Sequence, residues 1–248
     1  MKILVCISCV PDTTSKINFK NNNTIFDEQG VQFVINPNDE FGLTRAIWFK
    51  EKAGATVDVL HVGEDKADPT LRKALAIGAD KAIRVDTPAT DAFVVADQIS
   101  NYIKANPYDL IIAGRESIDY NGSMVPGMIA AMCDLAFVNT CVKIEIDGST
   151  ASATREMDGG MEVLRVELPM IIGSQKGLVE ETDLRIPNMR GIMQARQKPL
   201  TVVRPIESSS KTAISSFEKP APKAAVKLVP ANDIDQLIDL LQNEAKVL

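Results

Sequence analysis

The chain has few of the side chains that most catalytic and metal sites require. Its 248 residues include a single histidine, His61, and four cysteines. A His-based triad or a metal site is therefore not expected, because there is no second imidazole and Cys133 and Cys141 are not spaced as a metal pair. Cys6 and Cys9 form a CxxC, but Cys6 lies inside an apolar strand and not at the helix start that activates redox thiols. We expect buried or neutral roles for all five residues.

Positive charge and long apolar runs are also scarce. A net charge of −6 and a pI near 5.0 argue against nucleic acid and against an anionic membrane surface as partners. No apolar run is long enough to span a bilayer. The opening residues 1–7 are too short and too strand-like for a signal peptide. We therefore expect a cytoplasmic protein with no membrane insertion, whose 45% hydrophobic content supports a real core.

Short apolar runs and amphipathic helices alternate through the first 113 residues. The predicted strands are 2–8, 56–62, 81–85 and 109–113, and the predicted helices are 37–52, 69–77 and 92–104. Such alternation implies right-handed crossovers and a parallel sheet. The expected fold class is α/β, a Rossmann-like parallel sheet layered with helices. A small hairpin is predicted at 16–19 and 24–26, around a turn-rich tip.

After Leu135 the pattern changes to strands alone. Residues 138–146, 149–156 and 162–168 are strand-like and are joined by Asp-Gly and Asp-Gly-Gly turns. These turns favour antiparallel hairpins, so an antiparallel β annex is expected on one edge of the parallel sheet. Residues 170–173 and 200–203 add two short strands.

The end of the chain differs in composition from the rest. Residues 208–222 are rich in Ser, Lys, Ala and Pro and predict an extended arm. Asn232 is expected to cap a final helix whose apolar residues recur at helical spacing. Its apolar stripe must pack on its own body or on another chain. We divide the chain into a nucleotide-binding α/β domain, 1–205, and an arm with a C-terminal helix, 206–248.

The stretch 109–127 carries the strongest functional signal. An apolar strand ends at Gly114, a polar loop follows, and a helix begins near Gly122 to Pro126. A loop at the carboxyl end of a parallel strand, next to a helix start with free N–H groups, is a common nucleotide site. Arg115 adds a fixed positive charge. A solvated loop with good turn residues explains the stretch equally well, because no Walker or GxGxxG pattern is present.

The start of the first predicted helix is a second candidate. Asn36 is expected to be its N-cap, and Pro37 suits the first helical position. The acidic pair Asp39 and Glu40 suits the positive end of the helix dipole. Capping alone would explain these residues.

Residues 183–199 place apolar side chains among arginines. Exposed Met and Ile with an arginine rim usually mark a partner surface. The alternative is that this segment packs back on its own core.

Several stretches together resemble a known family. They are 3–13, Asn36-Pro37, 114–119, 153–164 with 169–172, and 187–193. In these stretches the chain resembles the beta (small) subunit of electron-transfer flavoproteins. It departs from the family where Ser8 replaces a common lysine, where Gly173 replaces another small residue, in the second half of the nucleotide loop at 124–127, and where Met189 replaces an anchoring leucine.

The resemblance implies a heterodimer that carries electrons and makes no bonds itself. An alpha subunit would hold most of the contacts to FAD, while this chain would bind AMP structurally and shape the FAD cleft. Electrons would come from flavoprotein dehydrogenases of the acyl-CoA dehydrogenase type, as in fatty acid β-oxidation, and pass to a membrane quinone oxidoreductase. Bifurcating relatives hold a second FAD at the AMP position and react with NADH, which is the alternative within the family.

The resemblance and the loop arguments together assign two sets of residues. The predicted AMP site comprises Cys6, Asn36, Pro37, Asn38, Asp39, Val62, Gly114, Arg115, Glu116, Ser117, Ile118, Asp119, Tyr120, Asn121, Gly122, Ser123, Met124 and Val125. The predicted docking site for the dehydrogenase comprises Arg185, Met189, Arg190, Ile192, Met193 and Arg196.

Two functions outside the family remain as rivals. One is a stand-alone adenine-nucleotide-binding module of the universal-stress type, which would lack the annex and the Met-Arg segment. The other is an enzyme that splits ATP at the alpha phosphate. That chemistry needs a glycine-rich loop after the first strand, and residues 8–12 do not form one.

Overall fold

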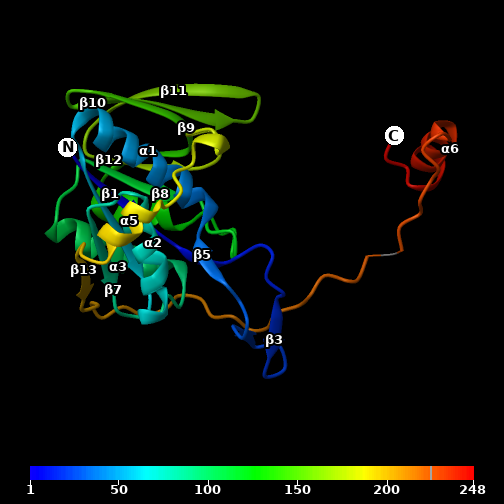
Figure 1. Cartoon of the computed structure of the whole chain (residues 1–248), viewed down its shortest axis with the longest axis horizontal. Helices are drawn as coiled ribbons and strands as arrows, with labels where there is room; N and C mark the ends of the chain where they lie inside the picture. Colours follow the sequence, from blue (N-terminus) through cyan, green and yellow to red (C-terminus); the bar gives the residue numbers. More distant parts are fainter. Residues whose placement is uncertain (224) are drawn as a thin grey trace.

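A nine-stranded sheet forms the centre of the molecule. The computed structural model describes residues 1–223 and 225–248. The strand order is β11-β10-β9-β12-β8-β1-β6-β7-β13 (Figure 1). The strands are β1 Lys2–Cys6, β6 Thr56–Val62, β7 Lys81–Val85, β8 Leu110–Gly114, β9 Ala136–Asp147, β10 Thr150–Met157, β11 Gly160–Glu167, β12 Met170–Ser174 and β13 Leu200–Val203. The predicted strands are confirmed to within a few residues.

Helices cover both faces of the parallel part, as the crossovers require. The helices are α1 Pro37–Ala53, α2 Asp68–Ile77, α3 Ala92–Ala105, α4 Val125–Cys133 and α5 Met189–Ala195, with short 3-10 turns at Asp65–Ala67 and Glu181–Asp183. One apolar core lies between the sheet and α1 and α2, with α5 packed outside α2. A second core lies between the sheet and α3 and α4. Figure 1 looks onto the face with α1, α2 and α5.

The antiparallel annex is confirmed. β10 pairs antiparallel with both β9 and β11. β9 itself runs parallel to β12, which runs parallel to β8. The annex is therefore a continuation of the main sheet and not a separate layer.

The first predicted strand is confirmed, but it ends at Cys6 and not at Ser8. The main-sheet strand ends at Cys6, and the chain then forms β2, Cys9–Pro11, which pairs antiparallel with β5, Phe33–Ile35. The physical reason is that the backbone N–H of Ser8 donates to the side chain of Asp39 instead of continuing the ladder. The predicted hairpin is confirmed as β3, Asn18–Lys20, with β4, Ile25–Asp27.

The predicted N-cap of the first helix is confirmed in position, and that of the last helix is wrong by one residue. Asn36 stands at the N-cap of α1, but its side chain makes no cap bond, because its amide bonds to the loop after β8. The last helix, α6 Ile234–Asp239, is capped by Asp233 and not by Asn232, and it continues as a π-helical turn, Leu240–Glu244. The arm leads away from the sheet to α6 (Figure 1).

The strand order defines where a ligand site belongs. From β1 the chain crosses to β6 and β7 on one side, then returns to β8 on the other side of β1. In open α/β sheets, ligands bind at the carboxyl ends of the strands where the order reverses. The crevice between β1 and β8 is that position in this sheet.

Candidate functional site

A cavity of about 330 Å³ lies at the carboxyl ends of β1, β6 and β8. Its apolar wall includes Val62, Val95 and Ile99, and its polar wall is the loop that follows Gly114. This volume is at the lower end of the range for small-molecule sites, which are mostly apolar with a few placed polar groups.

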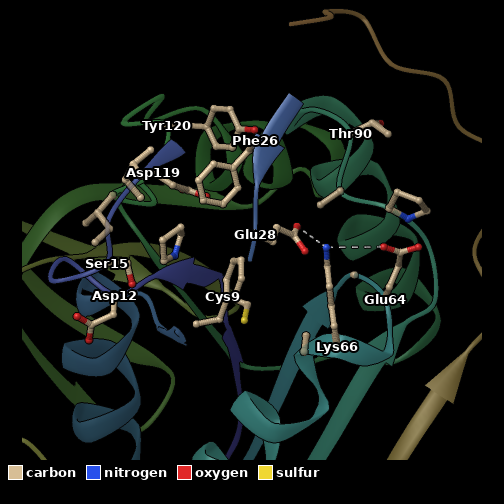
Figure 2. A pocket seen from close by; sticks show the side chains of 18 of the residues that line it. Cys9, Asp12, Ser15, Phe26, Glu28, Glu64, Lys66, Thr90, Asp119 and Tyr120 are labelled. Carbon is tan, nitrogen blue, oxygen red and sulfur yellow. Dashed lines mark hydrogen bonds and ion pairs between the residues drawn. The ribbon is translucent and has the colours of Figure 1, made fainter. Parts of the chain in front are cut away.

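A second cavity of about 710 Å³ adjoins the first. The two share wall residues that include Cys9, His61, Asp119 and Tyr120. Aromatic rings of the β3–β4 hairpin and β5 line it, and Figure 2 shows Lys66 reaching between the acidic side chains of Glu28 and Glu64. The two cavities are therefore neighbours at the strand ends.

Asp39 shapes the crevice between β1 and β8. Its side chain, at 2% residue exposure, accepts hydrogen bonds from the backbone N–H groups of Ser8 at 2.7 Å and Gly114 at 2.8 Å. Burial raises the pKa of Asp39 to about 7, although these N–H donors favour the charged form. The strand-end N–H groups that a bound anion would use are therefore already occupied by a protein carboxyl group.

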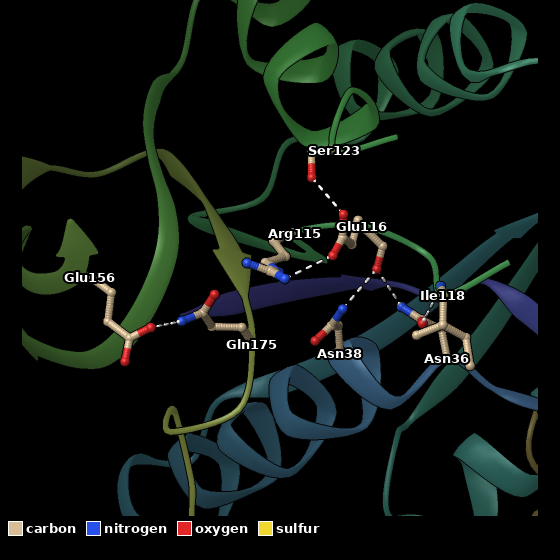
Figure 3. A network of polar contacts seen from close by, with 8 residues as sticks. All are labelled: Asn36, Asn38, Arg115, Glu116, Ile118, Ser123, Glu156 and Gln175. Atoms are coloured by element: carbon tan, nitrogen blue, oxygen red, sulfur yellow. Dashed lines mark hydrogen bonds and ion pairs between the residues drawn. The ribbon is translucent and has the colours of Figure 1, made fainter. Parts of the chain in front are cut away.

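Asn36 and Asn38 fix the loop after β8 (Figure 3). Their side-chain amides donate to the carbonyl oxygen of Glu116 at 2.9 and 3.0 Å, and the Asn36 side-chain oxygen accepts from the N–H of Ile118 at 3.2 Å. Sequence reasoning placed these asparagines in the site as a helix start. In the structure their side chains hold the loop after β8 in place through its backbone.

Glu116 is the centre of a polar network on the same loop. Its carboxylate accepts from Arg115 at 2.8 Å and from the hydroxyl of Ser123 at 2.8 Å (Figure 3). The arginine therefore neutralises a carboxylate that lines the cavity, and it is not a free cation pointing inward. Ser123 links the end of the loop to its start, close to the first turn of α4.

Most of the predicted nucleotide-binding residues meet at one place. Those that line the smaller cavity are Cys6, Asp39, Val62, Gly114, Glu116, Ser117, Asp119, Tyr120, Gly122, Ser123, Met124 and Val125. Ile118 lines the larger cavity. The predicted residues outside the described walls of both cavities are Asn36, Pro37, Asn38, Arg115 and Asn121.

The structure adds wall residues that sequence reasoning missed. They come from the loop after β7 (Thr90, Asp91), from α3 (Val95, Ile99) and from the arm (Thr212, Ala213, Ile214). The loop after β7 could have been found, because it follows a parallel strand as the other loops do. The arm residues carry no such signal, because a Ser-, Lys- and Pro-rich tail has no periodicity that predicts where it lies.

Comparison with known proteins assigns this architecture to a family. Residues 23–208 match the profile described as "Electron transfer flavoprotein domain". The chain is 37% identical, over its full length and 98% of the other protein, to the electron transfer flavoprotein subunit beta of Syntrophomonas wolfei. It is 32% identical, with both chains fully covered, to the subunit beta of Bacillus subtilis. The same identity and coverage hold for a subunit beta from Arabidopsis thaliana that is labelled mitochondrial. The chain belongs to the electron transfer flavoprotein family. The resemblance to beta subunits that its motifs predicted is confirmed.

The lone histidine and the first cysteine of this electron transfer flavoprotein chain are both buried. No cluster of three or more metal-ligating side chains occurs among the residues that the structure describes. Burial raises the pKa of the Cys6 thiol well above its usual value and lowers the pKa of His61, whose Nδ1 lies 2.8 Å from the carbonyl oxygen of Ile7. Within the described ranges, no helix has the length and apolar character needed to cross a membrane.

The predicted docking segment forms α5, a helix that the sequence reading missed. Arg72 donates to the carbonyl oxygens of Ala195 and Lys198, and a Cβ on Gly191 would lie 2.3 Å from a carbonyl oxygen of α2. These contacts attach one side of the helix to α2. The outward side carries exposed Met189, at 76%, together with exposed Ile192 and Met193, and exposed Ile186 lies just before the helix. Of the predicted arginine rim, Arg185 forms an ion pair with Glu51, and Arg190 and Arg196 flank the exposed side chains in sequence.

Proposed function

We propose that this chain is the beta subunit of a heterodimeric electron carrier and that its own task is to hold AMP beside an FAD bound mainly by an alpha subunit. The observation that supports the proposal is the convergence of the predicted nucleotide residues on one cavity at the β1/β8 crevice. The chain itself performs no covalent chemistry. When FAD is bound between the subunits, the flavin supplies the electron transfer, and this chain supplies shape and position.

The cavity residues fit an adenine nucleotide. The apolar wall formed by Val62, Val95 and Ile99 suits a base, and the loop that follows Gly114 offers hydroxyl and carboxylate groups to a ribose. The phosphate belongs at the loop preceding α4, because Asp39 occupies the N–H groups at the ends of β1 and β8. Pairing of Glu116 with Arg115 reduces the negative potential that a phosphate would meet.

A second FAD is the alternative nucleotide, and the adjoining cavity favours it. A dinucleotide needs more room than AMP, and the larger cavity shares a wall with the smaller one. Its aromatic rings, which include Phe19 and Phe26, suit a planar ring system. In that form the subunit would belong to a bifurcating carrier that reacts with NADH.

The outer partners follow from the exposed face of α5 and from the arm. We assign α5 as the docking site for acyl-CoA dehydrogenase-type donors, with Met189 as its apolar anchor. We assign the arm beyond the sheet, with the exposed stripe of Ile234, Leu237 and Ile238, to the alpha subunit. A membrane quinone oxidoreductase would accept the electrons, and the carrier itself would be cytoplasmic. The antiparallel strands β9–β11 and the α5 segment separate this chain from a stand-alone stress-type module.

The composition of the native complex tests the proposal. The complex is purified from its own cells, denatured, and the extract separated by chromatography. We expect two different chains with FAD and AMP in about equal amounts. Two FAD and no AMP would favour the bifurcating form. A single colourless chain, or a complex with flavin in the alpha subunit and no second nucleotide, would contradict the proposal.

A further inference from the structure

The first part of the arm does not leave the body directly. Residues 206–219, called here the strap, run from β13 past the start of α3 to the β3–β4 hairpin (Figure 1). At its first anchor the side chain of Gln98, at 3% exposure, exchanges two hydrogen bonds of 2.9 Å with the backbone of Ile206. A buried amide that satisfies both its donor and its acceptor on one residue fixes the strap where it leaves the sheet.

Asp91 is the second anchor. One carboxylate oxygen accepts from the N–H of Val94 at 2.8 Å and caps α3. The other accepts from the backbone N–H groups of Lys211 at 2.6 Å and Thr212 at 3.0 Å. Burial alone would raise the pKa of Asp91, but these N–H donors lower it below its usual value. Hydrogen bonds to a charged acceptor are about twice as strong as neutral ones, so this anchor holds the strap firmly.

The far end of the strap is held by an aromatic stack. The ring of Phe217 lies on that of Phe19 with centroids 4.6 Å apart and planes within 4°. The backbone N–H of Phe217 donates to the carbonyl oxygen of Asn23 at 2.7 Å, and Lys219 donates to Asn18 at 2.9 Å. Both ends of the strap are therefore attached to the body of the same chain.

Between these anchors the strap forms one wall of the candidate site. Thr212, Ala213 and Ile214 line the smaller cavity, and Ile214 and Phe217 line the larger one. The other walls are α3 and the loops at the ends of the parallel strands. A ligand in the cavity would lie between the strap and the sheet.

We propose that Asp91 is a positioning residue of the nucleotide site, which holds the strap over the bound nucleotide so that exchange requires the strap to detach. The inference rests on the proposed function, since it concerns the same nucleotide. It assigns the first part of the arm to retention of the ligand within this chain. Only the part beyond Lys219 then remains for contacts with another subunit.

The test is the rate at which the purified native complex exchanges its nucleotide for radiolabelled AMP. Asp91→Asn keeps a residue type that is a good N-cap for α3. Because only one of its two side-chain atoms can accept a hydrogen bond, the variant loses either the bonds to the strap or the bond to the helix cap. Phe217→Ala releases the other end of the strap and leaves the cap untouched. Asp97→Asn, on the same helix with the same change of charge, is the control.

We expect exchange to be about tenfold faster or more in Asp91→Asn and in Phe217→Ala, the change expected for the loss of one hydrogen bond to a charged group, and unchanged in the control. Amide hydrogen exchange at Lys211 and Thr212 should rise in Asp91→Asn. Faster exchange in Asp91→Asn alone would assign the effect to the helix cap. It would contradict the inference that the strap retains the nucleotide. Wild-type rates in both variants would also overturn it, while the proposed function would stand. A wild-type complex with no nucleotide at this site would defeat the proposed function, and this inference with it.

Discussion

The carboxyl group of Asp39 accepts a hydrogen bond from the backbone N–H of Gly114 at 2.8 Å. Since its second oxygen accepts from Ser8, a single side chain at the start of α1 ties together the ends of the two strands that flank the ligand crevice. A carboxyl group thus takes the place that a bound anion has in many α/β proteins. The geometry of the nucleotide loop therefore depends on a buried ionisable group.

That group should make stability depend on pH. Burial raises the pKa of Asp39 from 3.8 to about 7 in the folded chain. Between these values the folded state holds the proton more tightly than the unfolded state, so stability falls as pH rises from about 4 to 7 and then levels off. Asp39→Asn cannot titrate. We expect the free energy of unfolding in urea to fall between pH 5 and 8 in the wild type. The fall in Asp39→Asn should be smaller by about 1–3 kcal/mol. Parallel pH profiles would show that Asp39 does not carry this effect.

Asn36 should matter more to the site than its neighbour. Asn36→Ala removes bonds to Glu116 and Ile118, whereas Asn38→Ala removes one bond to a carbonyl oxygen that Asn36 still satisfies. We expect Asn36→Ala to cost about 1–3 kcal/mol of stability and to weaken nucleotide binding about tenfold or more. Calorimetric titration with AMP after removal of the native nucleotide measures this effect. Equal losses in the two variants would contradict a special role for Asn36.

Gly42 allows α1 to lie close to the sheet. A Cβ at this position would approach the side chain of Ile112 to 2.5 Å and that of Ser174 to 2.7 Å. Gly42→Ala should therefore overpack the interface, cost about 1–3 kcal/mol and displace Asp39, which lies one turn earlier. Gly160→Ala, where a Cβ would meet no atom within 4 Å, is the control. Urea unfolding measures the loss of stability, and nucleotide content measures the displacement of Asp39. Unchanged stability in Gly42→Ala would contradict the close packing of α1 on the sheet.

Met189 should act in docking and not in folding. Its side chain is 76% exposed, so Met189→Ala should leave stability within about 0.5 kcal/mol of wild type. As a central apolar anchor it should contribute about 2 kcal/mol to the complex with the dehydrogenase, which is roughly a thirtyfold loss in affinity. Met157→Ala, 50% exposed on the annex, is the matched control. Stopped-flow electron transfer measures the effect, and equal kinetics in both variants would remove Met189 from the docking site.

Truncation at two positions should distinguish the roles of the two parts of the arm. Removal of residues 220–248 takes away α6 and leaves the strap anchored on Phe19 and Asp91. We expect free subunits on size exclusion with AMP still bound to this chain. Removal from residue 206 should release AMP as well. A stable heterodimer after the shorter cut would contradict the assignment of the tail to the alpha subunit.

The sequence by itself determined the parallel sheet, its annex and the loops that form the site. Apolar runs, helical spacing and Asp-Gly turns act over a few residues, so they can be read locally. Only the tertiary structure decided that Asp39 holds the strand ends, that the Asn36 side chain supports a loop 80 residues away and makes no cap bond to its own helix, and that Gln98 and Asp91 hold the arm across the cavity. These are hydrogen bonds between segments far apart in the chain. They leave no periodic trace in the sequence, because each depends on where the completed sheet brings its loops.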